Sequence, residues 1–237
     1  MNFFYRNDIK MTSGKIITQL CHAAMLPLLS VAEKKDNGIF INAEYARKYM
    51  ESLILENMII TPLGSSAFFD IVESNKKNCH LIFDTGKTIF NGLFTATAFV
   101  FVDRDDLLTD VIDYEKMSYS ETNVRQVYLI NYNKKRDFNA VARDAIIACI
   151  QDIITSASTI PEKLFFCKGS EFYSWMMGGF PKIALISKNI DEQIKKIDNE
   201  GVVSVSVGNK DLMDSVVVIS PQNRAVVDNI TSGLRLY

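Results

Sequence analysis

The sequence predicts an α/β protein made of two tandem domains. Apolar runs typical of strands alternate with longer segments of helical periodicity, an order that indicates a layered fold with a mixed sheet. The same order of elements recurs in the second half of the chain at an offset of about 124 residues. The chain has 237 residues, enough for two domains of about 100–150 residues each. We therefore expect domains at residues 1–116 and 124–237, joined by a polar linker at 117–123.

The first half begins with an expected strand at residues 3–5 and a long helix at 13–35. Apolar residues recur at helical spacing through this helix, and Ser13 is placed to accept its first N–H groups. Asp36-Asn37-Gly38 supplies a stop, because glycine accommodates the conformation that ends a helix. The later elements expected in this half are a helix at 42–55, a strand at 58–62, a helix at 67–75, a buried strand at 79–83, a loop at 85–93, a strand at 95–102 and a helix at 105–114.

The second half is expected to follow a similar succession of strands and helices. Its closing helix is expected to run from Asn223 to Tyr237. The complete set is a strand at 126–130, helices at 138–154 and 171–177, a strand at 181–187, a helix at 190–199, strands at 202–207 and 215–220, and the helix at 223–237.

Polar motifs follow two of the predicted strands in the first half. In a sheet of this type, ligands gather at the carboxyl ends of strands and at helix N-termini. Lys15 stands in the first turn of the first helix, against the helix dipole, so we expect an acidic partner or a polyanion to hold it. Lys15 and Asp84, about 70 residues apart, are then expected to meet in one cleft, where they could form an ion pair.

The residues of both motifs resemble the signatures of the type II peptidyl-tRNA hydrolases. The first motif reads Asp-x-x-Met-x-x-Gly-Lys, followed by Gln and His-Ala along the helix, and the second reads Asp-Thr-Gly-Lys-Thr after a hydrophobic strand. Two positions depart from the family pattern, because Thr85 replaces the usual Ala and Ile89 replaces a Gln that is often found there. The matching residues are Asp8, Met11, Gly14, Lys15, Gln19, His22, Ala23, Asp84, Gly86, Lys87 and Thr88.

The resemblance implies a three-layer α/β/α domain with a four-stranded mixed sheet. It extends to the second half, so the expected fold is two such domains in tandem. Because members of the family are typically homodimers, the two copies are expected to form a pseudo-dimer within one chain. The activity implied is hydrolysis of the ester bond of peptidyl-tRNA, which releases free tRNA and peptide for tRNA recycling.

The resemblance also implies the site residues. Asp84 is expected to orient or deprotonate a water molecule, Lys15 to stabilise negative charge, and Thr88 to donate or relay a hydrogen bond. These three are the expected catalytic residues. The expected substrate-binding residues are Asp8, Lys10, Met11, Gly14, Gln19, His22, Gly86 and Lys87.

The second copy lacks this set and is expected to be inactive. The strand end that holds Asp84 in the first copy reads Gly208-Asn209-Lys210 in the second. In the register of the repeat, the positions of Lys15, Gln19 and His22 are occupied by Asn139, Arg143 and Ile146.

Composition limits the partners and cofactors. The net charge of −2 argues against a chain-wide basic surface, so tRNA binding is expected to use a local patch. Four scattered cysteines and the absence of a His/Asp/Glu cluster with ligand spacing predict no metal site and no cofactor. No apolar run reaches the roughly 20 residues that span a bilayer, so we expect a cytoplasmic protein with no membrane partner. The expected basic patch consists of Arg6, Lys10, Lys15 and Lys87.

Two interpretations of the function remain open from the sequence. One is the enzyme described above, as a monomeric tandem or a higher homo-oligomer. The other is a catalytically inactive module on the same fold that binds tRNA or a protein, since the second copy indicates that loss of the motif is tolerated. The presence of Lys15, Asp84 and Thr88 together in the first copy favours the enzyme.

Overall fold

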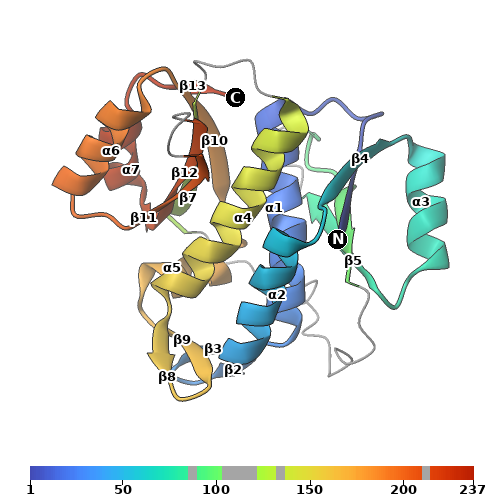
Figure 1. The fold of residues 1–237 in the computed structure, drawn as a ribbon, viewed down its shortest axis with the longest axis horizontal. Coiled ribbons are helices and arrows are strands. Elements are labelled where there is room, and N and C mark those ends of the chain that lie inside the picture. The colour runs from blue at the N-terminus through green and yellow to red at the C-terminus, as the bar shows by residue number, and fades with distance from the viewer. Residues whose placement is uncertain (85–89, 103–121, 132–136, 210–213) are drawn as a thin grey trace.

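The computed structural model describes residues 1–84, 90–102, 122–131, 137–209 and 214–237. Within these residues the chain forms seven helices and three β-sheets of four, five and four strands (Figure 1). The expected mixed α/β class is therefore confirmed. No helix among the described residues is long and apolar enough to cross a membrane.

The first sheet is built from the first half of the chain and has the strand order β4-β1-β6-β5. Strands β1 and β4 are parallel, whereas β6 runs antiparallel to both β1 and β5. Helix α3 covers the outer face, where Phe68 is fully buried against Phe99. The elements are β1 (Asn2–Arg6), β4 (Ile59–Leu63), α3 (Ser65–Ser74), β5 (Cys79–Asp84) and β6 (Thr95–Phe101).

The second sheet is built from the second half and has the order β11-β12-β7-β10-β13. Strands β7 and β10 are parallel, and β12 runs antiparallel to β7 and β11. Four of its strands thus repeat the order and directions of the first sheet, with β7 in the place of β1. Helices α6 and α7 cover its outer face. The elements are β7 (Val124–Asn131), β10 (Lys182–Ser187), α6 (Ile190–Asn199), β11 (Ser204–Asn209), β12 (Asp214–Asn223), α7 (Arg224–Thr231) and β13 (Arg235–Leu236).

The second sheet has five strands, so the expectation of a four-stranded sheet in each domain is wrong. The closing helix expected at 223–237 ends at Thr231, because Gly233 adopts a left-handed conformation with φ of 81°. The chain then turns back and β13 pairs antiparallel with β10, Leu236 opposite Leu185. An edge strand therefore replaces the end of the predicted helix.

A layer of helices lies between the two sheets (Figure 1). Helices α1 and α4 pack against each other there, and the largest hydrophobic core joins the inward faces of both sheets to these helices. The two halves therefore share one core. The helices are α1 (Ser13–Ser30), α2 (Ala43–Leu55) and α4 (Phe138–Ser156).

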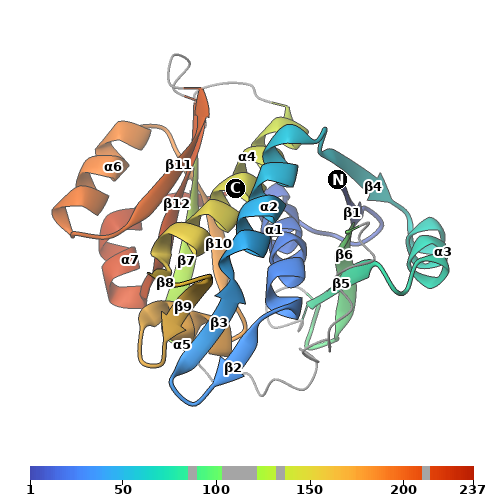
Figure 2. The same ribbon diagram turned by 60° about the horizontal axis from the view of Figure 1, so that its bottom comes forward.

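A third sheet, which was not expected, joins the two halves with the order β2-β3-β9-β8 (Figure 2). The helix expected at 13–35 ends at Ser30, and the residues that follow form a hairpin whose second strand pairs antiparallel with β9. Gly38 is required in this pairing, since a Cβ there would lie 2.2 Å from the carbonyl oxygen of Phe166. The strands are β2 (Glu33–Lys35), β3 (Gly38–Asn42), β8 (Ser158–Ile160) and β9 (Lys163–Cys167).

Most of the other expected elements are present within a few residues of their predicted bounds. Helix α2 begins at its Asn42 cap as expected, and α5 (Glu171–Met177) has the predicted limits. Strand β5 is only partly buried, because it lies at the edge of its sheet and Phe83 is 45% exposed. The helix expected at 105–114 and most of the loop expected at 85–93 lie outside the described residues.

Candidate functional site

The first turn of helix α1 is capped by Thr12 and not, as expected, by Ser13. The Thr12 side chain accepts a hydrogen bond from the backbone N–H of Lys15 at 3.2 Å, and its own backbone is extended. A hydroxyl in this position satisfies one of the first four N–H groups of a helix, which have no partner within the helix. The cap fixes where α1 begins, and so fixes Lys15 in its first turn.

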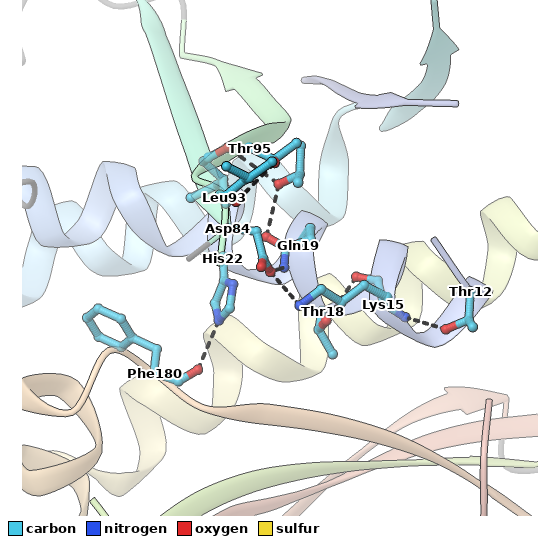
Figure 3. Close-up of polar contacts among 11 residues, drawn as sticks. Thr12, Lys15, Thr18, Gln19, His22, Asp84, Leu93, Thr95 and Phe180 are labelled. Atoms are coloured by element: carbon cyan, nitrogen blue, oxygen red, sulfur yellow. Dashed lines mark hydrogen bonds and ion pairs between the residues drawn. The ribbon is translucent and has the colours of Figure 1, made fainter. Parts of the chain in front are cut away.

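Strand directions bring the two sequence motifs to the same edge of the first sheet. Because β6 is antiparallel to both β1 and β5, the latter two point the same way and their carboxyl ends lie together. Helix α1 follows β1, and Asp84 is the last residue of β5. Lys15 and Gln19, one helical turn apart, therefore face Asp84 (Figure 3).

Lys15 and Asp84 form the expected ion pair. The ammonium of Lys15 contacts Oδ2 of Asp84, and Nε2 of Gln19 donates a hydrogen bond to the same oxygen at 2.8 Å. The Asp84 side chain is only 7% exposed and that of Lys15 is 22% exposed. A carboxylate so far from water is stable only when it is paired and hydrogen-bonded, so both neighbours are needed to hold it.

Thr97 supports Gln19 from inside the sheet. Its hydroxyl donates to Oε1 of Gln19 at 3.0 Å, and neither side chain is exposed by more than 2%. The Asp84 carboxylate can only accept, so the amide NH₂ group faces Asp84 and the amide oxygen accepts from the Thr97 hydroxyl. Sequence reasoning missed Thr97, although it is a lone polar residue with full burial inside the apolar strand β6.

His22 is held by the second half of the protein. Its Nε2–H donates to the backbone carbonyl of Phe180 at 2.9 Å (Figure 3). Burial, followed by the nearby charge of Lys182, lowers the pKa of the imidazole well below its usual value, although the bond to Phe180 acts in the opposite direction. The ring is therefore neutral near pH 7 and serves as a fixed hydrogen-bond donor.

The turn between β1 and α1 contains other residues expected in the site. Asp8 is exposed and accepts a hydrogen bond from Nε of Arg6 at 3.0 Å, and this guanidinium lowers the pKa of the Asp8 carboxyl. Lys10 is exposed, Met11 is half-buried and Gly14 is buried. The expected residues Gly86, Lys87 and Thr88 lie outside the described residues.

Two of the basic residues expected to form a patch are paired with carboxylates. Arg6 is paired with Asp8, and its guanidinium also lies 5.5 Å from the ring centre of Phe69. Lys15 is paired with Asp84. Of the members of the patch that the structure describes, Lys10 is the most exposed.

The second half places different side chains at the corresponding positions. Asn139 is exposed and Ile146 is completely buried in the shared core. Strand β11 takes the place of β5 in the sheet order, but its end carries Gly208 where a carboxylate would be required. At the described positions Asn139, Arg143 and Gly208, the second half thus carries none of the lysine, glutamine and carboxylate of the first half.

A different buried carboxyl group, missed by sequence reasoning, lies near the end of α4. Asp152 is fully buried and accepts hydrogen bonds from Gln126 at 2.7 Å, from Ser156 at 3.2 Å and from Ser220. Burial raises the pKa of Asp152 to about 6, and these hydrogen bonds oppose the shift. Asp152 lies at the opposite end of α4 from Asn139, so it is no counterpart of Asp84.

No group of three or more His, Cys, Asp and Glu side chains is placed to hold a metal ion in the part of the chain that the structure describes.

The candidate site consists of an amine, a carboxylate and a buried amide at one edge of a mixed sheet. Such a group can orient a water molecule, accept a proton and stabilise a negative charge. These capacities define a candidate acid–base site in an α/β domain.

Comparison with known proteins finds a family match over the part of the chain that contains this site. Residues 1–106 match the model of a family described as Peptidyl-tRNA hydrolase PTH2. The match includes Lys15, Gln19, Asp84 and Thr97, but it covers less than half of the chain and ends before the second sheet begins. No curated protein matches this chain.

One solved structure shows a limited similarity. It is a protein of unknown function from Agrobacterium tumefaciens strain C58, 11% identical, with a TM-score of 0.28. The alignment covers 49% of this chain and 98% of the other.

Proposed function

We propose that the protein hydrolyses the ester bond of peptidyl-tRNA and releases free tRNA and peptide for tRNA recycling. Two findings support this function: residues 1–106 match the PTH2 family, and that part of the chain holds Lys15 in contact with a buried Asp84. The Lys15–Asp84 pair is the main support for the proposal, since an isolated surface lysine at a helix start would not indicate catalysis.

In the proposed reaction, Asp84 orients the attacking water and accepts its proton. The water oxygen bonds to the ester carbonyl carbon, and a tetrahedral oxyanion forms next to the ammonium of Lys15. An ammonium has three N–H donors, so Lys15 can pair with Asp84 and face the oxyanion at the same time. When the intermediate collapses, the bond to the ribose oxygen breaks and the proton held by Asp84 passes to that oxygen, so peptide and tRNA separate.

The other expected site residues are assigned supporting roles. Gln19 and Thr97 are positioning residues, because they are buried behind Asp84 and hold its carboxylate. We assign Thr88 the donation or relay of a hydrogen bond to the reacting group. Substrate contacts are assigned to Asp8, Lys10, Met11, Gly86 and Lys87.

The second half is proposed to be a degenerate copy of the same domain, with the boundary in the linker at 117–123. The identical order and directions of four strands support this proposal, as does the position of α4 after β7. In this arrangement α1 and α4 pack as the central pair of a pseudo-dimer. The tandem then carries a single active site, as a monomer or within a higher homo-oligomer.

Release of free tRNA from purified N-acetyl-aminoacyl-tRNA tests the function. We expect turnover by the wild type, loss of turnover in Asp84→Ala and Lys15→Ala, and no change in Asn139→Ala, the matched position on α4. Equal losses in all three variants would contradict a single site in the first half. Binding that weakens between about 50 and about 200 mM salt without turnover would identify a tRNA-binding module instead. The absence of any binding would favour a protein partner.

A further inference from the structure

The C-terminal segment of the second half contacts the helix that holds Lys15. The backbone carbonyl of Tyr237 accepts a hydrogen bond from the N–H of Gly14 at 3.0 Å. Tyr237 is itself anchored, because its own N–H donates to the carbonyl of Ala184 at 3.0 Å and the preceding residues form β13. In Figure 1 the C-terminus accordingly lies beside the start of α1.

The close approach of this segment explains the glycine at position 14. A Cβ there would lie 2.6 Å from the Tyr237 carbonyl oxygen and 3.2 Å from the Ala184 Cβ. In a helix, glycine is less favourable than alanine by about 1 kcal/mol, so its presence needs a compensating contact. The alignment that pairs Lys15 with Asn139 pairs Gly14 with Phe138, whose ring lies 6.0 Å from that of Tyr5. Among the residues that the structure describes, a backbone carbonyl contacts the first turn of α1, and no such contact is found at Phe138 of α4.

Two carbonyl groups of the second half hold α1 at two points. The first is that of Tyr237 on Gly14, and the second is that of Phe180 on His22, two turns further along. Phe180 has a φ of 56°, a conformation that a bulky residue rarely adopts. Its N–H donates to the carbonyl of Trp175 at 3.0 Å, which helps to hold this backbone in place. Between the two contacts α1 presents Lys15 and Gln19 to Asp84.

We propose that residues 233–237 form a positioning element for Lys15. The Tyr237 carbonyl holds the first turn of α1 at the place where the ammonium meets Asp84, so the site of the first half depends on backbone atoms of the second. The kinetic consequence rests on the proposed hydrolase function. The docking of this segment on α1 does not.

The kinetic test compares two glycine-to-alanine substitutions. Gly14→Ala forces the Tyr237 carbonyl away from α1, whereas Gly64→Ala is a matched control at the start of α3, where a Cβ meets nothing within 4 Å. Because small displacements of catalytic groups cost up to about 100-fold in rate, we expect Gly14→Ala to lower kcat by about 10- to 100-fold with little change in KM. Gly64→Ala should behave as the wild type. An unchanged kcat in Gly14→Ala would overturn the proposal.

A second readout is independent of hydrolysis. The rate of acetylation of Lys15 by acetic anhydride is measured by mass spectrometry, with the exposed Lys48 as the internal reference. Gly14→Ala and deletion of residues 235–237 should each raise the relative rate of acetylation at Lys15 several-fold. Combining them should raise this rate little further, because both changes remove the same contact. Unchanged acetylation in both variants would refute the docking. If the wild type lacks hydrolase activity, the proposed function fails while acetylation still decides the docking.

Discussion

Gln19 Nε2 lies 2.8 Å from Asp84 Oδ2, and this hydrogen bond spans 65 residues of sequence inside the protein. The same carboxylate oxygen contacts the ammonium of Lys15, and the far side of the Gln19 amide is held by Thr97. One buried chain of polar groups therefore extends from strand β6 to the protein surface. Its outermost member is Lys15, whose side chain is 22% exposed.

Loss of the Thr97 hydroxyl is expected to disturb Asp84 without removing any group from the site. Thr97→Val keeps the shape of the side chain but leaves Oε1 of Gln19 without this donor, which costs about 1–3 kcal/mol of stability in a buried setting. We expect a lower kcat in Thr97→Val, measured by tRNA release, and retention of kcat in Thr97→Ser, which keeps the hydroxyl. Equal activity in both variants would show that the amide needs no such support.

Lys15 and Asp84 are expected to be coupled in stability as well as in activity. Lys15→Met leaves a buried carboxylate with one hydrogen bond fewer, and because the lysine is partly exposed we expect a loss of about 1–3 kcal/mol. Lys15→Met combined with Asp84→Leu should cost less than the sum of the single changes. The four unfolding free energies come from urea denaturation. Additivity within about 0.5 kcal/mol would indicate independent side chains.

The raised pKa of Asp152 predicts that the stability of the protein depends on pH. Its pKa is raised from 3.8 to about 6 in the folded protein, so the folded state binds a proton that the unfolded state has released. The stability contributed by the protonated group is present below pH 3.8 and is lost as the pH rises through 6. The full difference amounts to about 3 kcal/mol.

The variant Asp152→Asn isolates this contribution. The free energy of unfolding of the wild type should fall relative to that of Asp152→Asn as the pH is raised from about 4 to about 7. Urea denaturation across this range measures the difference. A constant difference between the two proteins would mean that Asp152 does not titrate in the folded state as described.

The pKa values of the two histidines predict that the stability of the protein falls as the pH is lowered below 6.5. Burial lowers the pKa of His80 from 6.5 to about 4, and that of His22 falls well below 6.5. The stability contributed by the neutral rings is present above pH 6.5 and is lost as the pH falls toward the folded pKa values. Imidazole NMR signals should show both rings neutral at pH 6. A ring that titrates near 6.5 would place that histidine in water.

The sequence was sufficient to predict the parts of the fold that depend on local pattern. Helices α2 and α5 and most strands of the first two sheets follow from periodicity and capping residues such as Asn42. The Lys15–Asp84 pair was also predictable, because Lys15 follows β1, Asp84 ends β5, and both strands end at the same sheet edge. Strand direction, once inferred, determines which side chains meet.

Features that depend on distant parts of the chain were not predictable. Strand β3 is stabilised by pairing with β9 from the other half. The local sequence at Gly38 indicates a helix stop, whereas this glycine admits the Phe166 backbone. Residues 235–236 become a strand only because the edge of β10 is available to them. Thr97 has no local signal beyond a hydroxyl in an apolar strand, since its partner Gln19 lies 78 residues away.

The most direct test of the central claim is the hydrolysis of N-acetyl-aminoacyl-tRNA by Asp84→Asn, a variant that keeps the size of the side chain but loses its charge and basicity. We expect kcat to fall by about 10²- to 10⁴-fold relative to the wild type, while tRNA binding and circular dichroism remain unchanged. A wild-type rate in Asp84→Asn would contradict the account, because the reaction would then proceed without the carboxylate on which the proposed site depends.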